Sequence, residues 1–100
     1  MKVVYAEHAR QDIASIHEAL IVRRPAIAQR VEDMIRAQCE KLADFPNVGV
    51  MTDRRGVRRL PLVRYPYTIF YRVDPAANRI EIARVVHGAR VKNLRKMPKE

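Results

Sequence analysis

The chain has 100 residues, of which 48% are hydrophobic and 31% charged, so it can form one globular domain but not two hydrophobic cores. No apolar run approaches the roughly 20 residues of a membrane-spanning helix, and Met1 to Tyr5 is too short for a secretion signal, so a cytoplasmic protein without membrane contact is expected. A single cysteine, Cys39, excludes an internal disulfide and a zinc site built from several thiolates, and the scattered histidines give no reason to expect a metal or any other cofactor.

The net charge of +9 is distributed unevenly along the chain. From Met1 to Asp53 there are 7 Lys and Arg against 8 Asp and Glu, whereas from Arg54 to Glu100 there are 13 against 3. The second half therefore carries a net charge of +10 (13 minus 3), and part of the folded surface should present a positive field. An acidic protein or a nucleic acid suits such a field, and a basic face that serves only solubility is the alternative.

The first half of the chain has the pattern of one strand and two helices. Lys2 to Tyr5 is short and β-prone, which favours a strand. Apolar residues at spacings of three and four then predict a helix from about His8 to Arg23, and Pro25 predicts the start of a second helix. The apolar stripe of the second helix is Ala28, Val31, Ile35, Cys39 and Leu42. Cys39 is therefore expected to be a small core residue and not a reactive thiol.

The second half changes to the period of a sheet. Phe45 to Gly49 ends the second helix, and Met51 to Gly56 is expected to be an exposed connection. Strands are then predicted from Arg58 to Val63, from Tyr67 to Val73 and from Arg79 to His87.

The last of these strands leaves one question open. Ile80 and Ile82 point to one side, whereas Ala83 and Val85 point to the other, so either face could be the buried one. Ala89 to Glu100 follows as a basic tail with the option of a short helix.

This order predicts an α+β fold, in which a helical hairpin packs on one face of a small, mostly antiparallel sheet (β-α-α-β-β-β plus a C-terminal tail). Residues 1–100 are expected to form one domain, with 89–100 as the tail. The other face of the sheet is then free for function, and the arginines of the later strands are expected to gather there.

Five segments of the sequence form a recognisable series. They are Ala9-x-x-Asp12-Ile13-x-x-Ile16, Leu42-x-x-Phe45-Pro46-x-x-Gly49, Arg59-Leu60, Tyr67-x-Ile69-x-Tyr71-Arg72-Val73 and Ile80-x-Ile82-x-x-Val85-x-His87-Gly88-x-Arg90. In this order and spacing they resemble the RelE/ParE superfamily of toxins, over nearly the whole chain. The resemblance implies the toxin of a type II toxin–antitoxin pair, a class that includes plasmid-stabilisation systems. It also implies a cognate antitoxin that holds the toxin inactive in a hetero-oligomer and whose carboxylates meet the basic surface.

The superfamily implies two mechanisms: RelE-like proteins cleave mRNA on the ribosome, and ParE-like proteins poison DNA gyrase. An RNase site needs cations around the phosphate and a group that moves a proton. On the RelE pattern a catalytic arginine falls on Thr68 and a basic pair falls on Arg59 and Pro61, so only Arg59 is kept. The arginine after the closing glycine is kept as Arg90, but a catalytic tyrosine of the tail falls near Lys96.

The resemblance therefore favours the ParE branch, with gyrase as the target and no assigned catalytic residue. The alternative is a RelE-like mRNA endonuclease that uses Arg59, Arg90 and His87, with His87 as general base and not as a structural strand-end residue. A third alternative is a non-toxic relic or a basic nucleic-acid-binding module. The residues expected to bind the target or the antitoxin are Arg58, Arg59, Arg64, Arg72, Arg84, Arg90, Lys92, Arg95 and Lys96.

Overall fold

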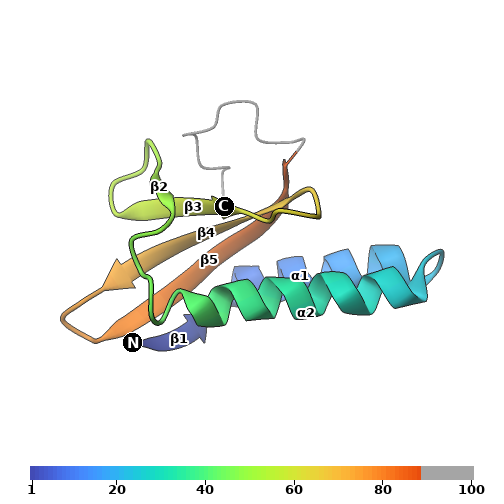
Figure 1. The fold of residues 1–100 in the computed structure, drawn as a ribbon, viewed down its shortest axis with the longest axis horizontal. Helices are drawn as coiled ribbons and strands as arrows, with labels where there is room; N and C mark the ends of the chain where they lie inside the picture. Colours follow the sequence, from blue (N-terminus) through green and yellow to red (C-terminus); the bar gives the residue numbers. More distant parts are fainter. Residues whose placement is uncertain (89–100) are drawn as a thin grey trace.

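The computed structural model describes residues 1–88, and these residues confirm the predicted α+β architecture. Strand β1 (Lys2–Tyr5) precedes helices α1 (Glu7–Ile21) and α2 (Pro25–Lys41), and these are followed by β2 (Val50–Met51), β3 (Val57–Pro61), β4 (Tyr67–Asp74) and β5 (Arg79–His87). The strands form one sheet in the order β1-β5-β4-β3-β2, in which β1 pairs parallel to β5 and the other neighbours pair antiparallel. Figure 1 shows the two helices running together beneath one face of the sheet.

The helices bury the apolar stripes that their sequences predict. Ala9 and Ile13 of α1 are buried, and Ala28, Val31, Ile35 and Cys39 are the buried residues of α2. Helix α1 ends at Ile21 and not at Arg23, because the chain must turn into Pro25. Arg24, the residue before this proline, lies outside the helical region with φ −141° and ψ 70°, as the clash with a following proline ring requires.

The short strand β2 was not predicted. Val50 pairs with Arg59 and Met51 with Arg58, so the sheet already begins where an exposed connection was expected. A strand this short shows no alternation that a sequence could reveal.

An irregularity in β5 answers the question that its sequence left open. Phe70 of β4 pairs with Arg84, but the next residue, Tyr71, pairs with Ile82. Ala83 is therefore an extra residue, a β-bulge, and the alternation restarts after it. Ile82 and Val85 consequently lie on the same side of the sheet, which neither simple alternation allowed.

The two faces of the sheet are buried in different ways. The helix face, which packs against α1 and α2, contributes Ile69, Tyr71, Ile80, Ile82 and Val85 to the main hydrophobic core. The open face, on the other side, carries a smaller buried cluster of Val57, Phe70 and Ala83. Within residues 1–88 no helix is long and apolar enough to cross a membrane.

Candidate functional site

The open face of the sheet has an apolar centre with polar side chains beside it. Val57 and Phe70 are fully buried there, and Val86 packs against them. Arg59 lies opposite Phe70 in the pairing of β3 with β4, and Thr68 lies two residues before Phe70 on the same face. Because Val57 and Phe70 are fully buried, this cluster supports the open face from within, and Arg59 and Thr68 lie beside it.

Arg59 is the buried cation of the open face. The residue is 9% exposed, and its Nε is a buried polar atom that has no hydrogen-bond partner in the part of the chain that the structure describes. A buried charged donor without an acceptor raises the free energy of the protein. A carboxylate or phosphate oxygen that reached this Nε would remove the penalty, which makes Arg59 a candidate anion-binding group.

Arg72 and Arg64 occupy more open positions. The Nη1 of Arg72 lies 3.3 Å from Oε1 of Glu81, its cross-strand neighbour on the open face, and both side chains are more than a third exposed. Arg64 is exposed in the connection between β3 and β4. It lines a groove of about 350 Å³ against α2, together with Arg30, Asp33, Met34, Ala37 and Tyr65.

Arg58 is turned toward the interior by the alternation of β3. Its cross-strand partner is Tyr71 of the helix face, and its Nη1 donates to the carbonyl oxygens of Asn47 (3.3 Å) and Gly49 (2.8 Å). The Tyr71 hydroxyl donates to the carbonyl of Pro46 (2.8 Å) and accepts from the N–H of Gly49 (2.9 Å). Arg58 and Tyr71 therefore hold the connection between α2 and β2 against the sheet.

Gly49 is needed in this connection because the backbone comes so close to the sheet. A Cβ atom at this position would lie 2.7 Å from the Tyr71 hydroxyl and 2.8 Å from the Arg59 carbonyl oxygen. The Pro46-x-x-Gly49 spacing thus has a structural reason, since it places both backbone partners of the Tyr71 hydroxyl.

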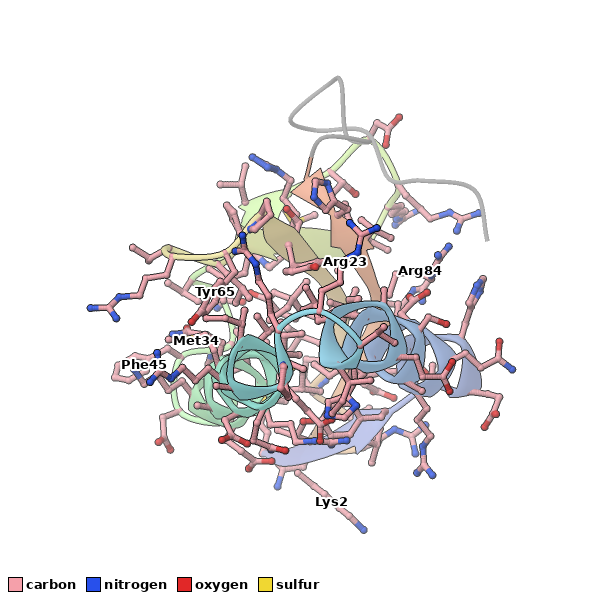
Figure 2. All side chains as sticks on the ribbon, turned by 90° about the vertical axis from the view of Figure 1, so that its right-hand side faces the viewer. Lys2, Arg23, Met34, Phe45, Tyr65 and Arg84 are labelled. Atoms are coloured by element: carbon pink, nitrogen blue, oxygen red, sulfur yellow. The ribbon has the colours of Figure 1, made fainter. Side chains whose placement is uncertain are left out.

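Arg84 joins β5 to α1. Its Nε lies 2.7 Å from Oδ2 of Asp12, its Nη2 lies 3.1 Å from Oδ1, and the two side chains are only 12% and 13% exposed. The same carboxylate accepts the backbone N–H of Val85 at 2.9 Å. The pairing of β5 with β1 ends at Ile82, so the Val85 N–H lies on a stretch of β5 that β1 does not cover. The Asp12 carboxylate provides the hydrogen-bond acceptor that a neighbouring strand would otherwise supply. Figure 2 shows Arg84 beside α1.

The prediction that the arginines of β3 to β5 gather on the open face is therefore wrong. Arg59 and Arg72 lie there, but Arg58 turns to the helix face and Arg84 reaches α1. Consecutive residues of a strand point to opposite faces, which separates Arg58 from Arg59. The predicted Arg90, Lys92, Arg95 and Lys96 lie outside the described residues.

The residues of the endonuclease alternative divide between the two faces. The RelE pattern aligns its catalytic positions in β3 and β4 with Arg59, Pro61 and Thr68. Pro61 pairs with Thr68 and Arg59 pairs with Phe70, so all three lie on the open face, and only Arg59 is charged. His87 pairs with Tyr67 and meets its ring edge-on, with the ring centroids 5.4 Å apart. Tyr67 belongs to the side that packs on the main core, so His87 lies across the sheet from Arg59.

Burial makes the tyrosines of this region poor proton donors. It raises the pKa of Tyr67 above its usual value of 10.0. Burial also raises the pKa of Tyr71, although the Gly49 N–H and the nearby Arg58 partly oppose this shift. Both hydroxyls therefore stay protonated near neutral pH. Among residues 1–88 no group of three or more His, Cys, Asp or Glu side chains could hold a metal ion.

Comparison with known proteins identifies the family. Residues 3–92 match the family described as "ParE toxin of type II toxin-antitoxin system, parDE". A search of curated proteins returns no match. Among solved structures, the chromosomal ParDE TA system from P. aeruginosa is 27% identical with a TM-score of 0.75, over 87% of this chain and 95% of that one. The toxin–antitoxin complex RelBE2 from Mycobacterium tuberculosis is 25% identical with a TM-score of 0.59, over 86% and 95%. Sequence, fold and motif geometry agree, and the chain belongs to the ParE toxin family of type II toxin–antitoxin systems.

Proposed function

We propose that this protein arrests growth by binding DNA gyrase, and that a cognate antitoxin neutralises it. The observation that carries the gyrase assignment is the separation of Arg59 and His87 by the sheet. A phosphate bound at Arg59 on the open face would have the sheet between it and His87, which argues against the action of both side chains on one phosphate. A gyrase poison requires a binding surface and no proton transfer, which the open face supplies.

The residues near Arg59 support the same assignment. Thr68 and Pro61 cannot supply the positive charge that a phosphoryl transition state needs. Arg64 is exposed and the Arg72 side chain is 37% exposed, so both can meet an acidic protein surface. On this proposal seven basic residues contact the target or the antitoxin directly: Arg59, Arg64, Arg72, Arg90, Lys92, Arg95 and Lys96. Arg58 and Arg84 contribute by holding the surface in shape.

The antitoxin partner follows from the family and from the charge. The similar structures carry the titles of a ParDE TA system and of a toxin–antitoxin complex. A net charge of +10 between Arg54 and Glu100 favours a partner rich in carboxylates. Both this partner and gyrase would meet the toxin in the cytoplasm.

The decisive experiment measures DNA supercoiling and DNA cleavage by purified gyrase in the presence of the folded, antitoxin-free protein. We expect inhibition at micromolar protein, and a loss of about tenfold in potency for Arg59→Gln, because arginine is among the residue types that contribute most to binding at interfaces. Arg79→Gln is the matched control. The side chain of Arg79, the first residue of β5, is half exposed, and its Nε lies 3.8 Å from Oδ2 of Asp74. Undiminished gyrase activity would rule out the proposal.

The same preparation should be added to translating ribosomes with an intact mRNA. We expect no cleavage of the message. Cleavage that Arg90→Ala abolishes would assign the protein to the endonuclease branch instead. Normal growth of cells that express the protein without antitoxin would leave only the non-toxic alternative.

A further inference from the structure

The connection between α1 and α2 is an exposed tip that is both apolar and basic. Its residues are Ile21, Val22, Arg23 and Arg24, which we name the hairpin tip. All four are exposed, Val22 to 84% and Ile21 to 41%. Figure 1 shows that the helices run past the sheet at this end, so the tip projects from the molecule. The Val22 side chain adds little to the core, and it is free to contact a partner.

The backbone of the hairpin tip is ordered by its own hydrogen bonds. The Leu20 carbonyl accepts the N–H of Arg23 at 3.2 Å and the N–H of Arg24 at 2.7 Å. Helix α2 then begins with Pro25, whose ring fixes the backbone of its first turn. A projection that is ordered before binding loses little conformational entropy in a complex, which favours association.

Positive charge surrounds the apolar side chains of the hairpin tip. From Ala19 to Val31 the chain has no acidic residue and three arginines, at 23, 24 and 30. None of the ion pairs within residues 1–88 involves Arg23 or Arg24. Helix α2 also starts here without a side-chain cap and without an acidic residue in its first turn, so the positive end of its dipole adds to the field. Carboxylates on a partner would therefore complement the tip.

The shape of the hairpin tip favours a folded protein as the partner. Figure 2 looks along the helices onto the tip and shows Arg23 there. A narrow projection fits a recess, and a folded domain can offer one, whereas an extended peptide cannot. The phosphates of a nucleic acid would pair with the two arginines but would leave Val22 in water. An apolar recess bordered by carboxylates would accommodate Val22 together with both arginines.

We infer that the hairpin tip inserts into an apolar recess, bordered by carboxylates, on the target protein. Val22 fills the recess, and Arg23 and Arg24 pair with the carboxylates at its rim. This inference rests on the proposed function, in which the target is gyrase. It adds a contact at the end of the helices, apart from the open face that carries Arg59.

Inhibition of DNA supercoiling by purified gyrase tests the inference. Val22→Asp places a carboxylate in the apolar recess, and Arg23→Glu combined with Arg24→Glu reverses the charge at its rim. We expect each change to weaken inhibition at least about tenfold, because it sets like charges against each other in the interface. Circular dichroism checks that each variant is folded, which the exposure of the altered side chains favours.

Two matched controls make the same kinds of change elsewhere on the surface. Phe45→Asp alters a residue that is 66% exposed and that follows α2 at the other end of the helical hairpin. Arg79→Glu reverses the charge of a half-exposed side chain at the start of β5. Both controls should inhibit gyrase within about twofold of the wild type.

Two binding measurements distinguish the target from the other possible partners. By isothermal titration calorimetry, the tip variants should bind the antitoxin encoded beside the toxin gene with a Kd within about twofold of the wild type. Loss of antitoxin binding with full potency against gyrase would assign the tip to the antitoxin and overturn the inference. Val22→Asp and Phe45→Asp change the net charge equally, so they should bind a fluorescein-labelled DNA duplex alike. A loss of DNA affinity confined to Val22→Asp would assign the tip to a nucleic acid.

Growth assays test the hairpin tip without reference to the identity of the target. The wild-type protein should arrest growth, and the folded tip variants should not. Full potency of both tip variants against gyrase overturns the inference and leaves the proposed function intact. A wild-type protein that does not inhibit gyrase refutes the proposed function, and growth arrest by both tip variants would then overturn the inference as well.

Discussion

At the scale of single residues, the Asp12 carboxylate connects α1 to β5. It accepts two hydrogen bonds from Arg84 and one from the Val85 N–H, in a site where both side chains are less than 15% exposed. Removing one partner of a buried ion pair leaves the other charge without compensation. We expect Asp12→Ala to lower the free energy of unfolding by about 3 kcal/mol, measured by urea denaturation. Glu81→Ala breaks the exposed pair with Arg72 and should cost less than about 1 kcal/mol. Equal losses for the two variants would contradict this interpretation.

Cys39 gives a prediction about pH. Burial raises the pKa of its thiol from 9.0 to about 12, and the hydrogen bond with Tyr5 opposes this only in part. The raised pKa means that the folded state holds its proton more tightly than the unfolded state. Stability is therefore full below about pH 9 and falls as the pH rises toward about 12.

Urea denaturation at different pH values checks this prediction. Between about pH 9 and pH 10 we expect Cys39 to contribute a loss of about 1 kcal/mol, which Cys39→Ala should remove, whereas the smaller losses from the buried tyrosines should remain. Native protein at about pH 8 should also react with Ellman's reagent only as fast as it unfolds, because the thiol is buried and neutral. Rapid reaction of the folded protein would contradict the assignment of Cys39 to the core.

At the scale of elements, the connection between α2 and β2 depends on Gly49. A methyl group there would overlap with the Tyr71 hydroxyl and with backbone of β3, neither of which can move freely. We expect Gly49→Ala to lower the free energy of unfolding by about 2 kcal/mol. Gly56→Ala is a control with open space around the new methyl but a φ of 78°, which should cost about 1 kcal/mol. A Gly49→Ala variant as stable as Gly56→Ala would show that the loop adapts.

The elements that could be predicted are those whose pattern lies within one segment. The stripe from Ala28 to Leu42 repeats often enough to define α2 and its buried side. The bulge at Ala83 could not be predicted, because register is a property of two paired strands and not of either sequence alone. The two-residue strand β2 was missed for a related reason, since only its pairing with β3 distinguishes it from a loop.

The same limit applies to the candidate site. Alternation requires Arg58 and Arg59 to point to opposite faces, but only the pairing with β4 decides which of them meets the helices. The bonds between Asp12 and Arg84 join residues far apart in the chain, so no local spacing announces them. The resemblance did contain a signal, because Asp12, Gly49 and Tyr71 all belong to its motifs. These three residues form hydrogen bonds that hold the fold together, so their presence in the motifs has a structural reason and does not require a role in catalysis.

At the scale of the whole molecule, the uneven charge should govern how fast the antitoxin associates. A net charge of +9 attracts an acidic partner over distances larger than any single contact, and salt screens this attraction. An exposed apolar side chain such as Phe45 acts only after contact, so it should influence how slowly the complex dissociates. The two properties can therefore be separated by kinetics.

Surface plasmon resonance on the toxin–antitoxin pair measures both rate constants. Raising sodium chloride from about 50 mM to about 500 mM should lower kon at least about tenfold while koff changes little. Phe45→Asp should raise koff more than it lowers kon, whereas Arg54→Gln together with Arg55→Gln should lower kon and reduce its dependence on salt. If kon did not depend on salt, the positive field would have no part in recognition, and short-range contacts alone would have to account for the choice of partner.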